Sequence, residues 1–337
     1  MNRLPSPLNM LLSRHTRRRE FIALTGGAVV WPLGAHAQQP AMTHVGIVTI
    51  QSPTSPPYAA FSQRLRELGY LEGQNLNLDF VNPARQPGGS AGAVQELIRR
   101  KVGIVLATYQ PTMAAVVAAA PGIPVVMIAV DYDPLAFGYI KSLARPGSEV
   151  TGLYLEQLDL AKKRVELLTQ ALPNVHAATV FWDSVSEDQL KATSVAAPEF
   201  GLQLADVQLR DQPYDYEKAL AQAPADFRNV VIFPTSPVFF RDRQRLAEFG
   251  VQHKIATVFG FREWVDAGGL FSYGVNLPAA YRRAAEFVDI IAKGTKPADL
   301  PVEQPTKFEL VLNLKTAKAI GVTISPPILV RADEVIE

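Results

Sequence analysis

The chain of 337 residues carries 33 basic and 32 acidic residues, so its formal net charge is +1. This balance argues against the concentrated basic surface that nucleic-acid binding requires. The absence of cysteine excludes disulfide frameworks, thiolate zinc sites and cysteine nucleophiles. The length predicts two domains of about 150 residues each.

The first forty residues resemble an export signal. A basic cluster at Arg17, Arg18 and Arg19 precedes an apolar run over residues 22–33, and residues 35–37 read Ala-His-Ala, the small-x-small pattern of a cleavage site. The apolar run is shorter than the roughly 20 residues that span a bilayer. We expect a signal peptide over residues 1–37 of the twin-arginine type and a periplasmic protein of a Gram-negative bacterium; an ordinary Sec signal or an uncleaved anchor is the alternative.

Cleavage after Ala37 would also change the charge balance. Residues 1–37 hold five Arg and one Glu, so the rest of the chain keeps 28 basic and 31 acidic residues, a net charge of −3. No run of five or six like charges occurs in the chain.

After the signal, short β-branched runs alternate with helical patterns. The pattern predicts strands over residues 44–50, 76–81, 102–108 and 123–130, with helices over residues 58–68, 91–100 and 111–120 between them. This alternation is typical of a parallel sheet with helices on both faces.

The alternation pauses over residues 131–151, which are rich in Pro, Gly and aromatic residues, and then restarts. The second unit has predicted strands over residues 177–182, 202–209, 229–234 and 255–259, and helices over residues 161–172, 187–200, 214–222 and 238–253. The same architecture therefore repeats without a repeat of the sequence.

The tail adds elements to these two units. It has a long predicted helix over residues 279–293, a strand over residues 308–313 and a short helix over residues 314–320. We expect an α/β fold of two Rossmann-like lobes with parallel sheets, joined by a multi-segment hinge. The predicted N-terminal lobe comprises residues 43–152 and 274–300, and the C-terminal lobe residues 153–273 and 301–337.

Three stretches resemble the substrate-binding proteins of ABC transporters, the family that includes tryptophan-binding TrpX-like members. They are residues 262–274 (REWVDAGGLFSYG), residues 300–318 (LPVEQPTKFELVLNLKTAK) and residues 142–152 (SLARPGSEVTG). The resemblance spans almost the whole chain. It implies a type I periplasmic-binding-protein fold, in which a ligand lies between two lobes joined by three crossing segments.

Two positions depart from the family pattern. Members often carry Asn-Pro where this chain has Trp182-Asp183, and many carry Asp where this chain has Pro234-Thr235-Ser236. Both positions should face the ligand, so a ligand cannot be transferred from a better-known member.

Candidate ligand contacts follow from the rule that ligands of open α/β sheets lie beyond the carboxyl ends of the strands. In the first unit these residues are Gln51, Ser52, Thr108, Tyr109, Gln110, Asp131 and Asp133. In the second unit they are Trp182, Asp183, Thr235, Ser236, Phe261 and Arg262. Thr108 to Gln110 flank a helix N-terminus, which suits a carboxylate, and the acidic pair Asp131 and Asp133 could hold a ligand ammonium.

Each of these residues also has a structural interpretation. Loops at strand ends are polar in any protein, and Ser52 and Asp133 are good capping residues. Tyr109 and Trp182 could be core or hinge aromatics, or could sandwich a planar ligand from opposite lobes. Arg262 and Glu263 could form a structural ion pair.

Motifs of common enzymes are missing from the sequence: no G-x-S-x-G, P-loop or H-E-x-x-H occurs, and the five histidines are scattered. We therefore expect a monomeric binding protein without catalytic residues, metal or cofactor, which presents a small organic ligand (an amino acid, peptide or aromatic acid) to an ABC permease in the inner membrane. The alternatives are a sensory binding protein that signals to a membrane receptor, and an isomerase that uses Asp131 or Asp133 as its base.

Overall fold

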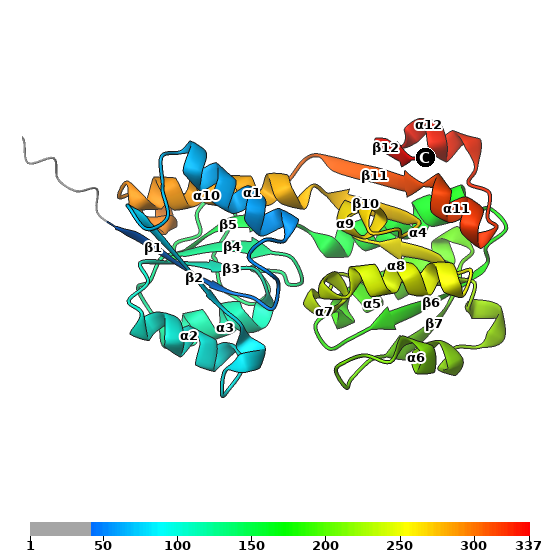
Figure 1. Cartoon of the computed structure of the whole chain (residues 1–337), viewed down its shortest axis with the longest axis horizontal. Helices are drawn as coiled ribbons and strands as arrows, with labels where there is room; N and C mark the ends of the chain where they lie inside the picture. Colours follow the sequence, from blue (N-terminus) through cyan, green and yellow to red (C-terminus); the bar gives the residue numbers. More distant parts are fainter. Residues whose placement is uncertain (1–41) are drawn as a thin grey trace, which may run out of the picture. The chain divides into compact units, whose positions relative to one another are not determined.

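Two sheets of mostly parallel strands, each covered by helices, form the part of the chain that the computed structural model describes, residues 42–337 (Figure 1). The predicted signal over residues 1–37 lies outside these residues. No helix within residues 42–337 is long and apolar enough to cross a membrane.

The first sheet has the strand order β2-β1-β3-β4-β5, and all its pairs are parallel. Its strands are β1 (Thr43–Val48), β2 (Leu76–Val81), β3 (Ile104–Ala107), β4 (Val125–Ala129) and β5 (Val150–Tyr154). The helices that connect them are α1 (Pro56–Glu67), α2 (Ser90–Arg99) and α3 (Gln110–Ala119), with a 3₁₀ turn, η1 (Pro83–Arg85). We call this sheet, with α1, α2, α3 and α10 (Leu277–Ala292), the N-terminal lobe.

Apolar side chains on both faces of the first sheet explain this arrangement. Val45 and Ile47 of β1 contribute to a buried cluster with Phe61 and Leu65 of α1, while Val105 of β3 belongs to the cluster under α2 and α3. Helix α10 returns from late in the sequence to pack beside α1 (Figure 1). The sheet is therefore buried on both faces, as parallel sheets require.

The second sheet has seven strands in the order β12-β11-β10-β9-β8-β6-β7. Its strands are β6 (Ala177–Trp182), β7 (Gln203–Gln208), β8 (Val230–Ile232), β9 (Ala256–Phe259), β10 (Phe271–Val275), β11 (Phe308–Asn313) and β12 (Glu334–Ile336). Only the pairing of β10 with β11 is antiparallel within the described sheet. We call this sheet and its helices the C-terminal lobe.

The helices of the C-terminal lobe cover both faces of its sheet. They are α4 (Gln157–Ala171), α5 (Glu187–Ala196), α6 (Tyr216–Gln222), α7 (Pro237–Arg241), α8 (Arg243–Gln252), α9 (Arg262–Asp266), α11 (Leu314–Ile320) and α12 (Pro326–Arg331), with 3₁₀ turns η2 (Ala197–Phe200) and η3 (Ala225–Phe227). The 3₁₀ turn η4 (Pro297–Asp299) follows α10 and contacts β5 of the N-terminal lobe. Leu168 of α4 packs in one cluster with Val180 of β6, whereas Leu246 of α8 packs in another with Phe181. Consecutive residues of β6 therefore face opposite layers, as in any strand.

The structure corrects several of the predicted elements. The single helix predicted over residues 238–253 is two helices, α7 and α8, because Asp242 has a ψ of 7° and interrupts the helical turn. Strands β5, β10 and β12 and helices α9 and α12 were not predicted as elements. The strands among them form by pairing with other segments of the chain, as β5 does with β4 and β12 with β11, and this pairing leaves no local hydrophobic pattern.

Three segments connect the lobes. They run from β5 into α4, from β10 into α10, and from η4 to β11. The first and third are paired, because the backbone N–H of Glu303 donates to the carbonyl of Gly152 at 2.9 Å and that of Tyr154 donates to the carbonyl of Glu303 at 2.9 Å. The residue limits of the two lobes remain a prediction, and β5 and β10 each extend across one of the predicted limits.

Candidate ligand-binding site

A cavity between the lobes lies at the carboxyl ends of the parallel strands. The first sheet reverses its strand order between β1 and β3, and the second between β6 and β8, so both sheets have a topological switch point where ligands of such folds bind. The cavity is lined from both lobes and from α10 by Gln51, Ser55, Pro57, Tyr58, Tyr109, Val130, Thr235, Phe240, Phe261, Leu277 and Tyr281.

The cavity is narrow in this structure. Its volume is about 10 Å³, which is room for about one water molecule. Gln51 closes it from one side, because its Nε2 atom donates to the carbonyl of Pro237 in the opposite lobe at 2.8 Å. Apolar side chains of both lobes also belong to one buried cluster, in which Tyr58 and Tyr281 join Phe240 and Phe261. A larger ligand therefore needs the lobes to separate before it can enter.

Two buried polar atoms of the N-terminal lobe, at or beside the cavity lining, have no hydrogen-bond partner. They are the hydroxyl of Ser55, which lines the cavity, and the Oδ2 atom of Asp131, which follows the lining residue Val130. The hydroxyls of Tyr58 and Thr108 lie close enough to each other for Thr108 to lower the pKa of Tyr58. Buried polar atoms are almost always paired in folded proteins, because an unpaired one loses its water without compensation. Two such atoms near one cavity are the groups to which a ligand could supply partners.

Asp131 is the charged group of this set. Its Oδ1 atom accepts a hydrogen bond from the backbone N–H of Gln110 at 3.2 Å. The carboxylate at the N-terminus of α3 therefore belongs to Asp131 and not to a ligand. Burial raises the pKa of Asp131 to about 7, and the negative charge of Asp183 contributes in the same direction.

Asp183 is held firmly on the C-terminal lobe. Its side chain accepts hydrogen bonds from Ser186 at 3.0 Å, from Tyr214 at 3.2 Å and from the hydroxyl of Ser236. Burial raises the pKa of this carboxyl, although these hydroxyl donors partly oppose the rise. Ser236 also accepts from the backbone N–H of Val238 at 3.2 Å, so it both begins α7 and orients Asp183.

A second network lies behind Thr235. The hydroxyl of Thr235 donates to Oε1 of Gln157 at 3.2 Å, and the guanidinium of Arg164 donates to the same Gln157 oxygen and, at 2.8 Å, to the carbonyl of Tyr273. Arg164 is only 4% exposed, and burial lowers its pKa to about 10. Gly260 makes room for this side chain, because a Cβ atom there would lie 3.1 Å from its Nη2.

Four of the predicted contact residues, Gln51, Tyr109, Thr235 and Phe261, line the cavity. Thr108, Asp131 and Ser236 do not line it, although each is next to a lining residue in the chain, and Asp183 accepts a hydrogen bond from Ser236. Gln110 donates to Asp131 through its backbone and to the Tyr139 hydroxyl through its side chain. Placement does not establish binding, and the set stays a prediction.

The other predicted contact residues make contacts of their own outside the cavity. Ser52 is exposed and shares a hydrogen bond with Thr54, while Asp133 accepts from the backbone N–H of Leu135 and Ala136. The indole N–H of Trp182 donates to Asp206 at 3.0 Å. Arg262 forms ion pairs with Asp266, Glu309 and Glu334, whereas the predicted pair with Glu263 is not formed.

Sequence reasoning missed the aromatic wall of the cavity. Tyr58 and Tyr281 are almost fully buried, with their rings edge to face and their centroids 5.0 Å apart, and Phe240 comes from the short helix α7. Tyr281 lies more than 200 residues after Tyr58, and a helical period cannot show that α10 returns to the first sheet. The only local sequence signal for this aromatic wall was the predicted helix that starts at Tyr58.

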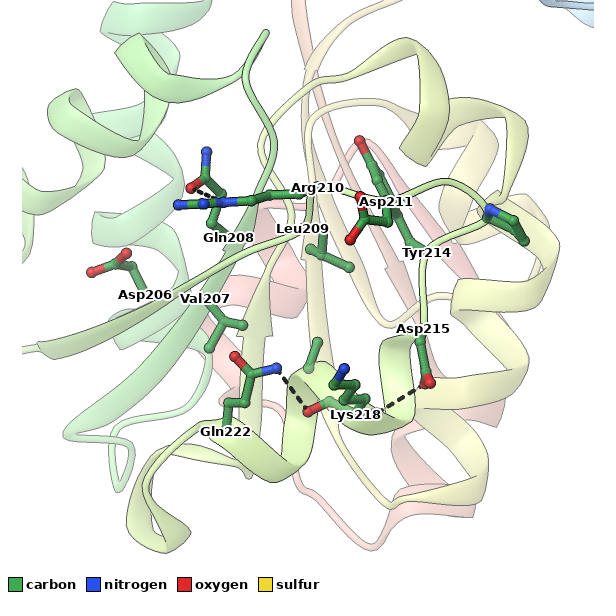
Figure 2. A pocket seen from close by; sticks show the side chains of 12 residues that line it. Asp206, Val207, Gln208, Leu209, Arg210, Asp211, Tyr214, Asp215, Lys218 and Gln222 are labelled. Atoms are coloured by element: carbon green, nitrogen blue, oxygen red, sulfur yellow. Dashed lines mark hydrogen bonds between the residues drawn. The ribbon is translucent and has the colours of Figure 1, made fainter.

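Roomier hollows also lie elsewhere, among them one of about 340 Å³ beside residues 172–175 and two larger ones. One, of about 580 Å³, is lined by residues of β7, α6 and the loop between them (Figure 2). Its side chains bond to nearby groups of the chain, such as Gln222 to the carbonyl of Lys218. The other, of about 590 Å³, lies along the hinge segments and contains the Arg283–Glu303 ion pair.

Within residues 42–337, no group of three or more His, Cys, Asp or Glu side chains could hold a metal ion. The residues that line the cavity present hydroxyl, amide, aliphatic and aromatic groups, which suits the binding of an organic molecule.

The chain is similar to known proteins in both sequence and fold. The chain is 23% identical over 272 residues to a tyrosine-binding protein of Clostridioides difficile, with 77% of this chain and 75% of the relative covered. A conserved domain protein of Vibrio cholerae matches the fold with a TM-score of 0.76 at 24% identity, covering 88% of this chain and 99% of that one.

A second solved structure is an ABC domain from Streptococcus pneumonia in complex with L-Trp. It has a TM-score of 0.76 at 23% identity, and the alignment covers 88% of this chain and all of that one. These likenesses confirm the predicted type I periplasmic-binding-protein fold of two α/β lobes. The model of the ABC transporter substrate binding proteins matches residues 51–336, and the chain belongs to that family.

Proposed function

We propose that this protein is the substrate-binding component of an ABC importer and that it closes on a small organic ligand carrying an ammonium group. The observation that carries the proposal is the cavity between the lobes, where the hydroxyl of Ser55, which has no partner, adjoins an aromatic wall, and where Asp131, with an unpaired Oδ2, follows the lining residue Val130. The tyrosine-binding relative and the L-Trp complex support a ligand of amino-acid size.

The mechanism follows from the two-lobed architecture. A ligand that contacts both lobes favours the closed state by its differential affinity, and the hinge segments absorb the rotation. No chemical step is needed, and we expect the protein to release its ligand unchanged to a permease. The permease partner, the periplasmic location and export through the predicted signal belong to this proposal.

A ligand screen tests the binding function. A compound that binds only the folded protein stabilises it by about 2.7 kcal/mol when its concentration is 100 times its Kd. We expect at least one amino acid, amine or aromatic acid in a thermal-shift panel to raise Tm by several degrees. If no small organic compound raises Tm or gives heat on titration, the proposed function is contradicted.

Tyr109 offers a residue-level test of the cavity. Its ring lines the cavity, and burial raises its pKa well above the usual range, so the phenol is neutral. We expect Tyr109→Ala to weaken the binding of the compound that the screen identifies by roughly tenfold. Tyr109→Phe keeps the ring and should bind within about twofold of the parent protein. Equal affinities for all three proteins, measured by calorimetry, would place the ligand elsewhere.

A further inference from the structure

We propose that a carboxylate of the ligand binds at the N-terminus of α1, where the hydroxyl of Ser55 and the backbone N–H of Tyr58 donate hydrogen bonds to it. This inference rests on the proposed binding function and adds a chemical requirement to it, because the ligand then carries a carboxylate as well as an ammonium group. It also assigns that carboxylate to the start of α1 and not to the start of α3, where the sequence suggested it.

Helix α1 begins with two donors that the protein does not use. Ser55 is its N-cap residue, and a Ser at this position normally accepts from an N–H two or three residues later, yet the Ser55 side chain makes no such bond. Pro56 and Pro57 have no N–H, so the first backbone donor of the helix is the N–H of Tyr58. This N–H has no hydrogen-bond partner within residues 42–337.

Both donors belong to residues that line the cavity between the lobes. Ser55 is only 7% exposed, and its hydroxyl is buried without a partner. A buried polar group without a partner loses its hydration without compensation, so these donors favour a ligand that supplies acceptors. A carboxylate suits the pair, because each of its two oxygens can accept one of the two hydrogen bonds.

The charge at the start of α1 also favours an anion. An α-helix has a partial positive charge at its N-terminus, and α1 is 12 residues long and has no acidic side chain in its first turn. No Lys, Arg or His is among the residues that line the cavity. A carboxylate in the cavity is therefore best held by the helix N-terminus and its free donors, which is a common way to bind anions in proteins.

Helix α3 also begins at the cavity, but its donors are occupied. The N–H of Gln110 donates to Asp131, and that of Thr112 donates to the carbonyl of Tyr109 at 3.1 Å. A carboxylate of the protein thus already lies at this helix start, and a second one there would be repelled.

Two short helices of the opposite lobe are less suitable as well. At the start of α7, the hydroxyl of Ser236 donates to Asp183 and accepts from the N–H of Val238. The N–H of Phe239 has no partner within the described chain, but α7 has only five residues. Helix α9 also has five residues and carries Glu263 in its first turn. The start of α1 is therefore the better place for an anion.

Another helix of the same chain provides an internal comparison. Helix α12 also begins with Ser-Pro-Pro, at residues 325–327, and Ser325 has φ −64° and ψ 137°, close to the −62° and 148° of Ser55. There the hydroxyl of Ser325 donates to the carbonyl of Gln170, and the N–H of Ile328 donates to the carbonyl of Ser325 at 3.1 Å. The same local sequence therefore pairs both donors at α12 and leaves both free at the cavity.

Pairs of amino acids and their amides test this inference. We would titrate the protein at pH 6.5, where both amines of a pair are protonated, with L-tyrosine, L-tryptophan and L-phenylalanine and with the amide of each. Any other carboxylate that the screen identifies is compared with its amide in the same way. We expect at least one carboxylate to bind at least roughly tenfold more tightly than its amide, because hydrogen bonds to a charged group are about twice as strong as neutral ones.

The variant Ser55→Ala removes one of the two donors. It should weaken the binding of that carboxylate by roughly tenfold and the binding of its amide by at most about threefold, because the amide accepts only a neutral hydrogen bond. Since Ser55 makes no capping hydrogen bond, the Tm of the ligand-free variant should stay close to that of the parent protein.

The matched control is Ser325→Ala. It removes the same hydroxyl from the Ser-Pro-Pro start of α12, where the donor bonds to Gln170. We expect the affinities for the carboxylate and for its amide to equal those of the parent protein. A loss of binding as large as that of Ser55→Ala would show that the effect does not arise in the cavity, and the inference would be overturned.

The outcomes distinguish this inference from the proposed function. If the amides bind as tightly as the carboxylates, or if the screen identifies only ligands without a carboxylate, the inference is overturned and the binding function stands. The same holds if Ser55→Ala binds as the parent protein does, or if it weakens carboxylate and amide equally. If no compound of the pairs or of the screen binds, the proposed function fails and this inference fails with it.

Discussion

Replacing Glu263 by Gln is expected to stabilise the ligand-free protein at pH 8 by on the order of 3 kcal/mol and to change its stability little at pH 4. Glu263 of α9 is only 4% exposed, and neither of its carboxylate oxygens has a hydrogen-bond partner. Burial raises its pKa from 4.5 to about 7, the charges of Glu309 and Asp266 add to the rise, and Arg262 opposes it.

The sign of the effect follows from proton linkage. Because the folded pKa lies above the unfolded value, the folded protein binds the proton more tightly, and this stabilisation is complete below about pH 4.5. It is lost as the pH rises through about 7, where the buried carboxyl ionises. Gln resembles the protonated acid at every pH, so the gain appears only at high pH.

Chemical denaturation of both proteins at pH 4 and pH 8 measures the difference. Asp131→Asn should behave in the same way, because burial raises the pKa of Asp131 from 3.8 to about 7. That variant should therefore be more stable than the parent at pH 8 even though it loses ligand affinity. A parent protein that is as stable as Glu263→Gln at pH 8 would show that Glu263 ionises without cost.

Gly152→Ala is expected to destabilise the protein by roughly 3–5 kcal/mol or to prevent folding. Gly152 lies on β5, in the first connection between the lobes, and pairs with Met127 of β4. Its φ of +130° belongs to the region that favours glycine, and a Cβ atom there would lie 2.1 Å from the carbonyl oxygen of Met127. The edge of the first sheet would have to separate from β4 to admit a methyl group.

Gly122→Ala is the matched control for this prediction. Gly122 also has a positive φ, of +90°, but a Cβ atom there meets nothing within 4 Å. We expect it to cost only about 1–2 kcal/mol, the price of the backbone conformation alone. Thermal unfolding followed by circular dichroism compares the two, and equal losses would mean that the close approach to Met127 has no effect.

Much of the fold could be predicted from the sequence because its strands are buried on both faces. The strands at residues 76–81, 177–182 and 308–313 were predicted with the limits that the structure has. These runs contain apolar or β-branched residues bounded by turn residues, and local pattern is sufficient for them.

The short elements at the hinge could not be predicted because their conformation depends on distant partners. The Pro-Gly sequence before Val150 indicates a loop, yet residues 150–154 form β5 because β4 and the segment around Glu303 pair with it. Strand β11 of the tail likewise pairs with β10 in antiparallel register, a contact between segments that are distant in the sequence. Neither contact leaves a local signal.

The candidate site was predictable at the level of loops but not of side chains. The switch points of the two sheets bring Tyr109 and Thr235 to one cavity, as the strand-end rule predicts. The rule does not state which polar residue of a loop turns inward. Asp131 leaves one buried oxygen unpaired, whereas Asp133, two residues later, caps its own turn.

A crystal structure of the protein with the compound that binds most tightly in the screen tests the central claim most directly. We predict closed lobes with the ligand nitrogen about 2.7–3.2 Å from Oδ2 of Asp131 and an apolar group of the ligand against Tyr109 and Phe261. A ligand bound instead in the hollow between β7 and α6, or one without an atom near Asp131, would contradict the account.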